Sequence, residues 1–197
     1  RSAELAVIHA ALREDLPFEL ALHAEDDRAD PAAARVVAER FVADPFLARS
    51  GGTWFLFFEA LNEQSWHGDI AYATSTDGLT WTYGGVALNE SFHLSYPYVF
   101  EWQGTWYMVP ETNIRNDVRL YRAVSFPSQW VLDTTLVSGR AYVDPSLVQF
   151  GGLWWLFAST TANTELYLFS APDLRGPYTA HPQSPVVQGD LSRARPG

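Results

Sequence analysis

Four carboxylates in this sequence occupy repeated positions. Asp44 and Asp144 each stand directly before a proline, and Glu59 and Glu111 each stand five residues after a tryptophan. Such a set, once folding brings it together, suits glycoside hydrolysis, because that reaction needs one carboxylate ionised and another kept protonated at neutral pH. The apolar runs before the two glutamates predict surroundings that raise their pKa values. We therefore expect these four residues to be the catalytic candidates.

The positions recur because a module occurs three times in the chain. Each copy opens with an X-Pro step and continues through a glycine turn and a tryptophan-led apolar run to a closing aromatic residue. The openers are Asp44-Pro45, Tyr96-Pro97 and Asp144-Pro145, which lie 52 and 48 residues apart. A fixed period of about 40 to 50 residues with four short strands is typical of propeller blades. The sequence therefore predicts an all-β fold, a β-propeller of the five-bladed type.

The chain should contain about three blades and the start of a fourth. We expect blades over about 42–88, 94–137 and 142–187, with the fourth opening in the residues up to 197. Residues 1–41 are Ala-rich, with apolar residues at helical spacing, which predicts a short helical N-terminal segment. A closed propeller needs at least four blades. Three explanations are open. The one that we favour is that the chain is a piece of a longer protein and that blades are missing. Alternatively, a partner chain completes the ring, or the N-terminal helices cover an exposed strand edge.

Blade geometry predicts where these residues meet. The start of a blade's first strand and the end of its second strand lie at the same face, so the four carboxylates should share one mouth with Tyr96 and Ser159. Loops and linkers at the same face would rim this mouth and supply stacking surfaces and hydrogen bonds for a sugar. The candidate substrate-binding residues are Trp66, His67, His93, Tyr96, Arg115 and Arg193.

Each candidate also has a purely structural explanation. An aspartate before a proline commonly fixes the entry to a strand and caps nearby backbone N–H groups. A glutamate at the end of a strand often solvates a rim or pairs with an arginine, here Arg115 or Arg119. The tryptophans of the apolar runs are expected to pack between blades.

Composition excludes several other classes of function. The 197 residues carry a net charge of −10 without a basic patch, which argues against nucleic acid as a partner. The chain has neither Lys nor Cys, which excludes Schiff-base and thiol chemistry. The five His are scattered, so no metal site or cofactor is expected, although converging carboxylates leave a structural divalent cation at the axis as an option. No apolar run approaches the roughly 20 residues of a membrane span.

Several of these motifs resemble a known superfamily, the five-bladed propellers of glycoside hydrolase families 32, 43, 62 and 68. A longer pattern is similar to the N-terminal domain of glucosamine inositolphosphorylceramide transferase and its bacterial relatives. The residues that carry the resemblance are Ala43-Asp44-Pro45, Trp54 to Glu59, Ser75 to Trp81, Tyr107 to Thr112, Val143-Asp144-Pro145 and Ser192 to Gly197.

The resemblance implies roles for particular residues. In family 43, the aspartate that corresponds to Asp44 is the general base, and the one that corresponds to Asp144 tunes the pKa of the general acid. The family's general acid is a glutamate that opens the fourth blade, but residues 192–197 contain none. Glu111 or Glu59 would have to replace it.

Three hypotheses for function follow. In the first, the chain is a glycoside hydrolase-like, carbohydrate-active propeller that acts on a glycan or glycolipid sugar. In the second, it is a non-catalytic sugar-binding or accessory domain of a glycosyltransferase system. In the third, weaker hypothesis, its open blade edges recruit another chain.

Overall fold

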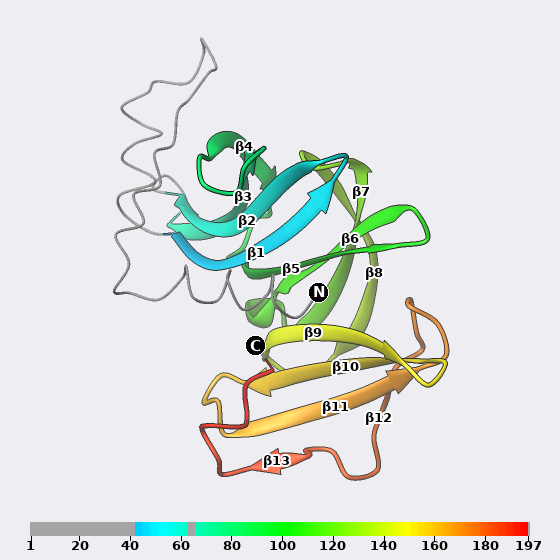
Figure 1. Ribbon diagram of the computed structural model, residues 1–197. Helices are drawn as coiled ribbons and strands as arrows, with labels where there is room; N and C mark the ends of the chain where they lie inside the picture. The colour runs from blue at the N-terminus through cyan, green and yellow to red at the C-terminus, as the bar shows by residue number, and fades with distance from the viewer. Residues whose placement is uncertain (1–41, 63–65, 197) are drawn as a thin grey trace.

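The computed structural model describes residues 42–62 and 66–196 as three antiparallel sheets (Figure 1). The prediction of an all-β fold is confirmed: within these ranges, the helical structure consists of one short 3-10 turn, η1 (Asn113–Arg115). The predicted N-terminal helices fall on residues 1–41 and lie outside the described residues. In the described part of the chain, no helix is long and apolar enough to cross a membrane.

The strands pair in sequence order within each sheet. The first sheet consists of β1 (Val42–Ser50), β2 (Thr53–Asn62), β3 (His67–Ser75) and β4 (Thr82–Leu88). The second consists of β5 (Ser95–Trp102), β6 (Thr105–Glu111), β7 (Asp117–Ser125) and β8 (Gln129–Ser138). The third consists of β9 (Tyr142–Phe150), β10 (Leu153–Thr160), β11 (Glu165–Ala171) and β12 (Thr179–Ala180), and β13 (Val187–Gln188) also pairs with β11.

Glycine turns define the first hairpin of each sheet. Gly51 and Gly52 link β1 to β2, and both have positive φ, at 56° and 88°. A two-residue hairpin loop with two positive φ angles matches the twist of its flanking strands, and glycine adopts that conformation without strain. Gly151 and Gly152 repeat the arrangement between β9 and β10. These turns fix the register on which the later positions depend.

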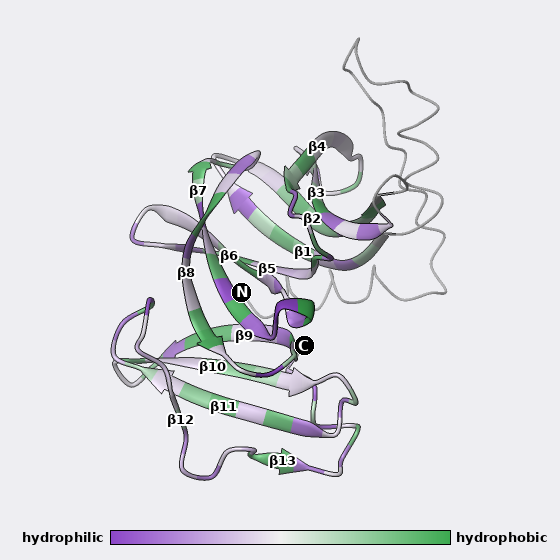
Figure 2. Ribbon diagram, turned by 180° about the vertical axis from the view of Figure 1, so that it is seen from behind, coloured by the Kyte–Doolittle hydropathy of each residue, from purple (hydrophilic) through white to green (hydrophobic). Residues whose placement is uncertain are grey.

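Aromatic layers hold successive sheets together. The first and second sheets pack around Phe57, Phe126 and Trp130, with Phe126 stacked on Trp106 at 4.3 Å between ring centroids. The second and third sheets pack around a separate cluster that includes Trp154. Figure 2 shows the basis of this packing, because hydrophobic and hydrophilic positions alternate along the strands. The first strands meet as well: β1 lies against β5, and β5 against β9.

Candidate functional site

The first strand of every sheet is distorted at the same place, the X-Pro opener. Asp44, Tyr96 and Asp144 have φ angles of 50°, 46° and 52°. Each lies where the register with the neighbouring strand shifts, as in a β-bulge. Positive φ is strained for residues other than glycine, and residues before proline avoid helical backbone conformations. Such strain tends to gather at functional sites, so these three positions mark the region from which the site is built.

A second set of equivalent positions faces the openers from the neighbouring strand. Glu59 on β2 pairs with Ala43, and Glu111 on β6 pairs with Ser95. Both glutamates are buried, with 8% and 9% of their surfaces exposed. Ser159 on β10 takes the corresponding place in the third sheet, and its hydroxyl donates to the carbonyl of Glu165. The repeat therefore brings one polar side chain from the end of each second strand to the distorted openers.

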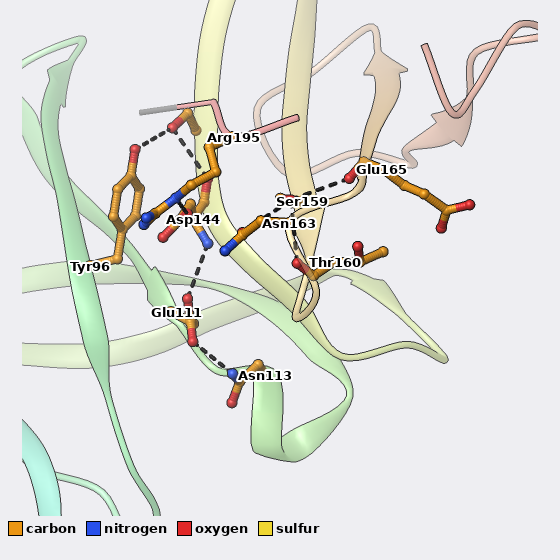
Figure 3. A network of polar contacts seen from close by, with 10 residues as sticks. Tyr96, Glu111, Asn113, Asp144, Ser159, Thr160, Asn163, Glu165 and Arg195 are labelled. Atoms are coloured by element: carbon orange, nitrogen blue, oxygen red, sulfur yellow. Dashed lines mark hydrogen bonds and ion pairs between the residues drawn. The ribbon is translucent and has the colours of Figure 1, made fainter. Parts of the chain in front are cut away.

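Glu111 and Asp144 are joined directly across the second and third sheets. The Asp144 N–H donates to Oε2 of Glu111 at 3.1 Å, and the amide of Asn113 donates to Oε1 at 2.7 Å (Figure 3). Asp144 is itself only 3% exposed. Both carboxyl oxygens of Glu111 are thus occupied, which holds this side chain in one orientation.

Arg195 supplies a positive charge at the same place. Its Nε donates to Oδ2 of Asp144 at 2.6 Å (Figure 3). Asp190 orders the turn that carries it, because its carboxylate accepts from the Ser192 N–H and its carbonyl accepts from the Ala194 N–H. About half of the Arg195 side chain is exposed, whereas the Asp144 side chain is almost wholly buried. The arginine therefore covers Asp144 from the solvent side.

Electrostatic coupling shows that the four predicted carboxylates share one environment. Burial is the main cause that raises the pKa of Glu111 to about 7, and the negative charges of Asp144, Asp44 and Glu59 also raise it. The hydrogen bond from the Asp144 N–H has the opposite effect and lowers this pKa. Burial also raises the pKa of Glu59 to about 7, with the charge of Asp44 adding to it. The pKa of Asp44 is raised by burial and by Asp144, and lowered by Arg195. Two carboxyl groups that titrate near neutrality thus stand beside two aspartates.

One of the two histidines predicted to bind substrate contacts this cluster. Nε2 of His93 is 3.5 Å from Oε1 of Glu59. Nδ1 of His67 is 3.4 Å from Oδ1 of Asp69. The structural alternative in which Glu59 or Glu111 pairs with Arg115 or Arg119 does not describe these contacts, since Glu59 faces a histidine and Glu111 holds an asparagine and a backbone N–H.

The other predicted binding residues lie in more varied places. Tyr96 is only 6% exposed, and its hydroxyl is 3.0 Å from that of Ser146, so its ring lies between sheets (Figure 3). Trp66 is 77% exposed. Arg115 is exposed in η1 and lies over the ring of Phe92 at 5.6 Å.

Arg193 is exposed in the turn that carries Arg195. Sequence reasoning selected Arg193 and missed Arg195, which contacts Asp144, and Asn113, which contacts Glu111. The segment containing Arg195 had been marked by the resemblance, but spacing alone did not distinguish its two arginines.

The described residues hold no ready-made metal centre. Within 42–62 and 66–196, no group of three or more His, Cys, Asp or Glu side chains is arranged to hold an ion. The divalent cation at the axis stays a prediction.

Family comparison places this site in context. Residues 29–196 match the family model described as "Glucosamine inositolphosphorylceramide transferase 1, N-terminal". The chain belongs to this family. Relatives named glucosamine inositolphosphorylceramide transferase 1 are 45% identical in Oryza sativa subsp. japonica and 38% identical in Arabidopsis thaliana, each over 159 residues and 77% of this chain. The chain spans only about a fifth of their length, 21% in both cases.

Solved structures show the fold of this family member. A family 117 glycoside hydrolase from Zobellia galactanivorans superposes with a TM-score of 0.61 at 21% identity, over 75% of this chain and 57% of that one. An exo-beta-1,3-galactanase from Phanerochaete chrysosporium gives a TM-score of 0.62 at 17% identity, over 71% of this chain and 35% of that one. The fold is therefore that of the glycoside hydrolase propellers, as the sequence motifs predicted. The number of blades in a complete ring stays a prediction.

Proposed function

We propose that this family member is a carbohydrate-active propeller that binds a sugar unit of a glycan or glycolipid at its carboxylate mouth and acts on it as glycoside hydrolases do. The mouth consists of Asp44, Glu59, Glu111 and Asp144. The observation that carries the proposal is the meeting of acids from three sheets, with the Asp144 N–H 3.1 Å from Glu111. Carboxyl groups that titrate near pH 7 beside further carboxylates are what general acid and base chemistry at neutral pH requires.

The contacts favour a division of roles. Asp44 is the base or nucleophile in this proposal, because the resemblance to family 43 implies that role for this position and its carboxyl group lies among the other acids of the mouth. Glu59 suits the acid better than Glu111, because both oxygens of Glu111 are already hydrogen-bonded. Asp144, held by Arg195, tunes the charge of the site.

A second candidate function is a non-catalytic, sugar-binding accessory domain of a glycosyltransferase. One observation favours it: in the segment where family 43 would place its acid, this chain carries Arg195, which is committed to Asp144. The relatives that the chain matches over about a fifth of their length are named transferases. In this version the mouth holds the sugar and performs no cleavage.

Turnover separates the two candidates. The full chain is incubated with a panel of p-nitrophenyl hexosides and hexosaminides, and the release of p-nitrophenol is measured for the wild type and for Asp44→Asn. Loss of a general base predicts a fall of roughly 10²-fold or more, whereas Glu101→Gln, an exposed control on β5, should leave the rate unchanged. An unchanged rate in Asp44→Asn would overturn the enzyme proposal.

Calorimetry with the corresponding methyl glycosides tests the accessory domain. This candidate predicts binding without turnover, with an affinity that survives Glu111→Gln. Absence of binding to every sugar in the panel would count against both candidates.

A further inference from the structure

The linker between β4 and β5 is tied to the start of β3 by two opposed hydrogen bonds. The Leu94 N–H donates to the Gly68 carbonyl at 2.8 Å, and the Gly68 N–H donates to Nδ1 of His93 at 2.9 Å. This second bond leaves Nε2 of His93 facing Oε1 of Glu59 at 3.5 Å. The separation is loose, as in many catalytic pairs before a substrate closes the site.

The junction admits only a glycine at position 68. A Cβ atom there would lie 2.4 Å from the Leu94 carbonyl oxygen and 2.7 Å from Oε1 of Glu59. The backbone of β3 therefore passes directly over the Glu59 carboxyl group, and the same backbone holds the imidazole of His93. Glu59 and His93 are thus placed by one rigid junction.

The hydrogen bond from Gly68 decides which nitrogen of His93 carries the proton. A ring nitrogen that accepts a hydrogen bond has no proton of its own, so Nδ1 is bare and the proton is on Nε2, toward Glu59. Protonating Nδ1 would break the bond from Gly68. Burial, with the neighbouring His67, lowers the pKa of His93 in the same direction. The backbone therefore keeps this imidazole neutral.

His67 is held in the opposite way. Its Nδ1 faces two acceptors, the Gly68 carbonyl at 3.3 Å and Oδ1 of Asp69 at 3.4 Å. A proton is therefore required on Nδ1 of His67. The two histidines therefore differ in tautomer, and His93 is the one that presents its N–H to Glu59.

We propose that His93 is a positioning residue for Glu59: its fixed Nε2–H orients the carboxyl group, so that Glu59, and not the histidine, takes up and releases the proton of the site. A neutral donor favours the carboxylate form without adding a positive charge. The use of that proton in sugar chemistry rests on the proposed function, whereas the titration itself is a property of the unliganded protein.

Other charged groups around the pair act on the same equilibrium. Asp44 on β1 raises the pKa of Glu59, and Glu111 on β6 is coupled to it. On the side of the histidine, His67 on β3 lowers the pKa of His93, and Asp69 lies against His67. These charged groups are all retained when His93 alone is replaced, but the Gly68 N–H loses its acceptor. The comparison of His93→Leu with His93→Gln therefore isolates the effect of the N–H toward Glu59, because both variants lack Nδ1.

Nuclear magnetic resonance on the full chain without sugar tests this inference. Imidazole ¹⁵N shifts report the tautomer of His93, and side-chain ¹³C shifts report the titration of Glu59. We expect His93 to keep its proton on Nε2 from pH 9 to pH 6 while Glu59 titrates near pH 7. Finding the proton on Nδ1, or finding that His93 becomes charged before Glu59 is protonated, would overturn the proposal.

Variants separate positioning from simple packing. Loss of the donor in His93→Leu should raise the pKa of Glu59 by about half a unit to one unit. His93→Gln, which can present an N–H near the position of Nε2, should restore most of the wild-type value. His181→Leu is the matched control, because Nδ1 of His181 also accepts a backbone N–H but its ring lies beside Trp155. An unmoved Glu59 in His93→Leu would contradict the inference, whatever the outcome of the turnover assay.

Discussion

At the scale of the residue, two buried glutamates make the stability of this protein depend on pH near neutrality. The pKa of Glu59 and of Glu111 is about 7, against an ordinary value of 4.5. Between these values the folded protein binds more protons than the unfolded chain. The stability that these groups contribute is therefore fully present below about pH 4.5 and is lost as the pH rises through 7.

Replacing Glu111 with glutamine should remove its part of this pH dependence. The amide can keep an acceptor toward the Asp144 N–H, and Asn113 can rotate to accept from the new donor. We expect the fall in the free energy of unfolding between pH 5 and pH 8, measured by urea denaturation, to be smaller than in the wild type by about 1 to 3 kcal/mol. Glu101→Gln on the exposed face of β5 is the control and should follow the wild type. The same slope in Glu111→Gln and wild type would contradict the pKa shift.

At the scale of the element, the site depends on how strands meet linkers. At Gly68, β3 lies close to the linker between β4 and β5, and a methyl group there would collide with Leu94 and Glu59. We expect Gly68→Ala to lower the free energy of unfolding by about 1 to 3 kcal/mol through overpacking, and to disturb the titration of Glu59.

A second glycine provides the comparison. Gly104 has a positive φ of 76° but open space around it. Gly104→Ala should therefore lose about 1 kcal/mol through backbone strain alone and leave Glu59 unaffected. Chemical denaturation measures the stability of both variants, and NMR titration measures the pKa of Glu59 in each. Equal changes of this pKa in Gly68→Ala and Gly104→Ala would show that the junction at Gly68 does not position Glu59.

The strands and turns were predictable where residues close in the sequence determine them. Tryptophan-led runs and glycine turns specify strands and hairpins within a few residues, and the repeat then brings Asp44 and Asp144 to equivalent bulges. The contact between Arg195 and Asp144 was not predictable in this way, because it joins residues 51 positions apart through a turn that Asp190 orders. The packing of Tyr96 was not predictable from its equivalence to the two aspartates. Its ring packs against Phe46, and its hydroxyl lies 3.0 Å from that of Ser146.

At the scale of the whole molecule, the mouth exists only because separate sheets are held together by aromatic layers. Trp154 joins the third sheet to the second, with its ring 5.1 Å from that of Trp102 and 5.9 Å from that of Phe100. Since Glu111 and Asp144 lie on opposite sides of this interface, its packing also sets their separation.

Trp154→Ala should therefore destabilise the fold strongly. Truncating a buried tryptophan predicts a loss of about 3 to 5 kcal/mol, measured by urea or thermal denaturation. Trp66→Ala is the matched control, because Trp66 is 77% exposed and should change stability by less than about 0.5 kcal/mol. A variant of Trp154 within 1 kcal/mol of the wild type would show that the second and third sheets do not depend on this layer.

The most direct test of the account is to locate the sugar-binding surface. The full chain, with its backbone and carboxyl resonances assigned, is titrated with methyl glycosides of a hexose, a hexosamine and a uronic acid. We predict saturable shifts centred on the side chains of Asp44, Glu59 and Glu111, and their loss in Asp44→Asn. Saturable shifts confined to residues far from these carboxylates, or none with any of the three sugars, would contradict the claim that this mouth is a carbohydrate site.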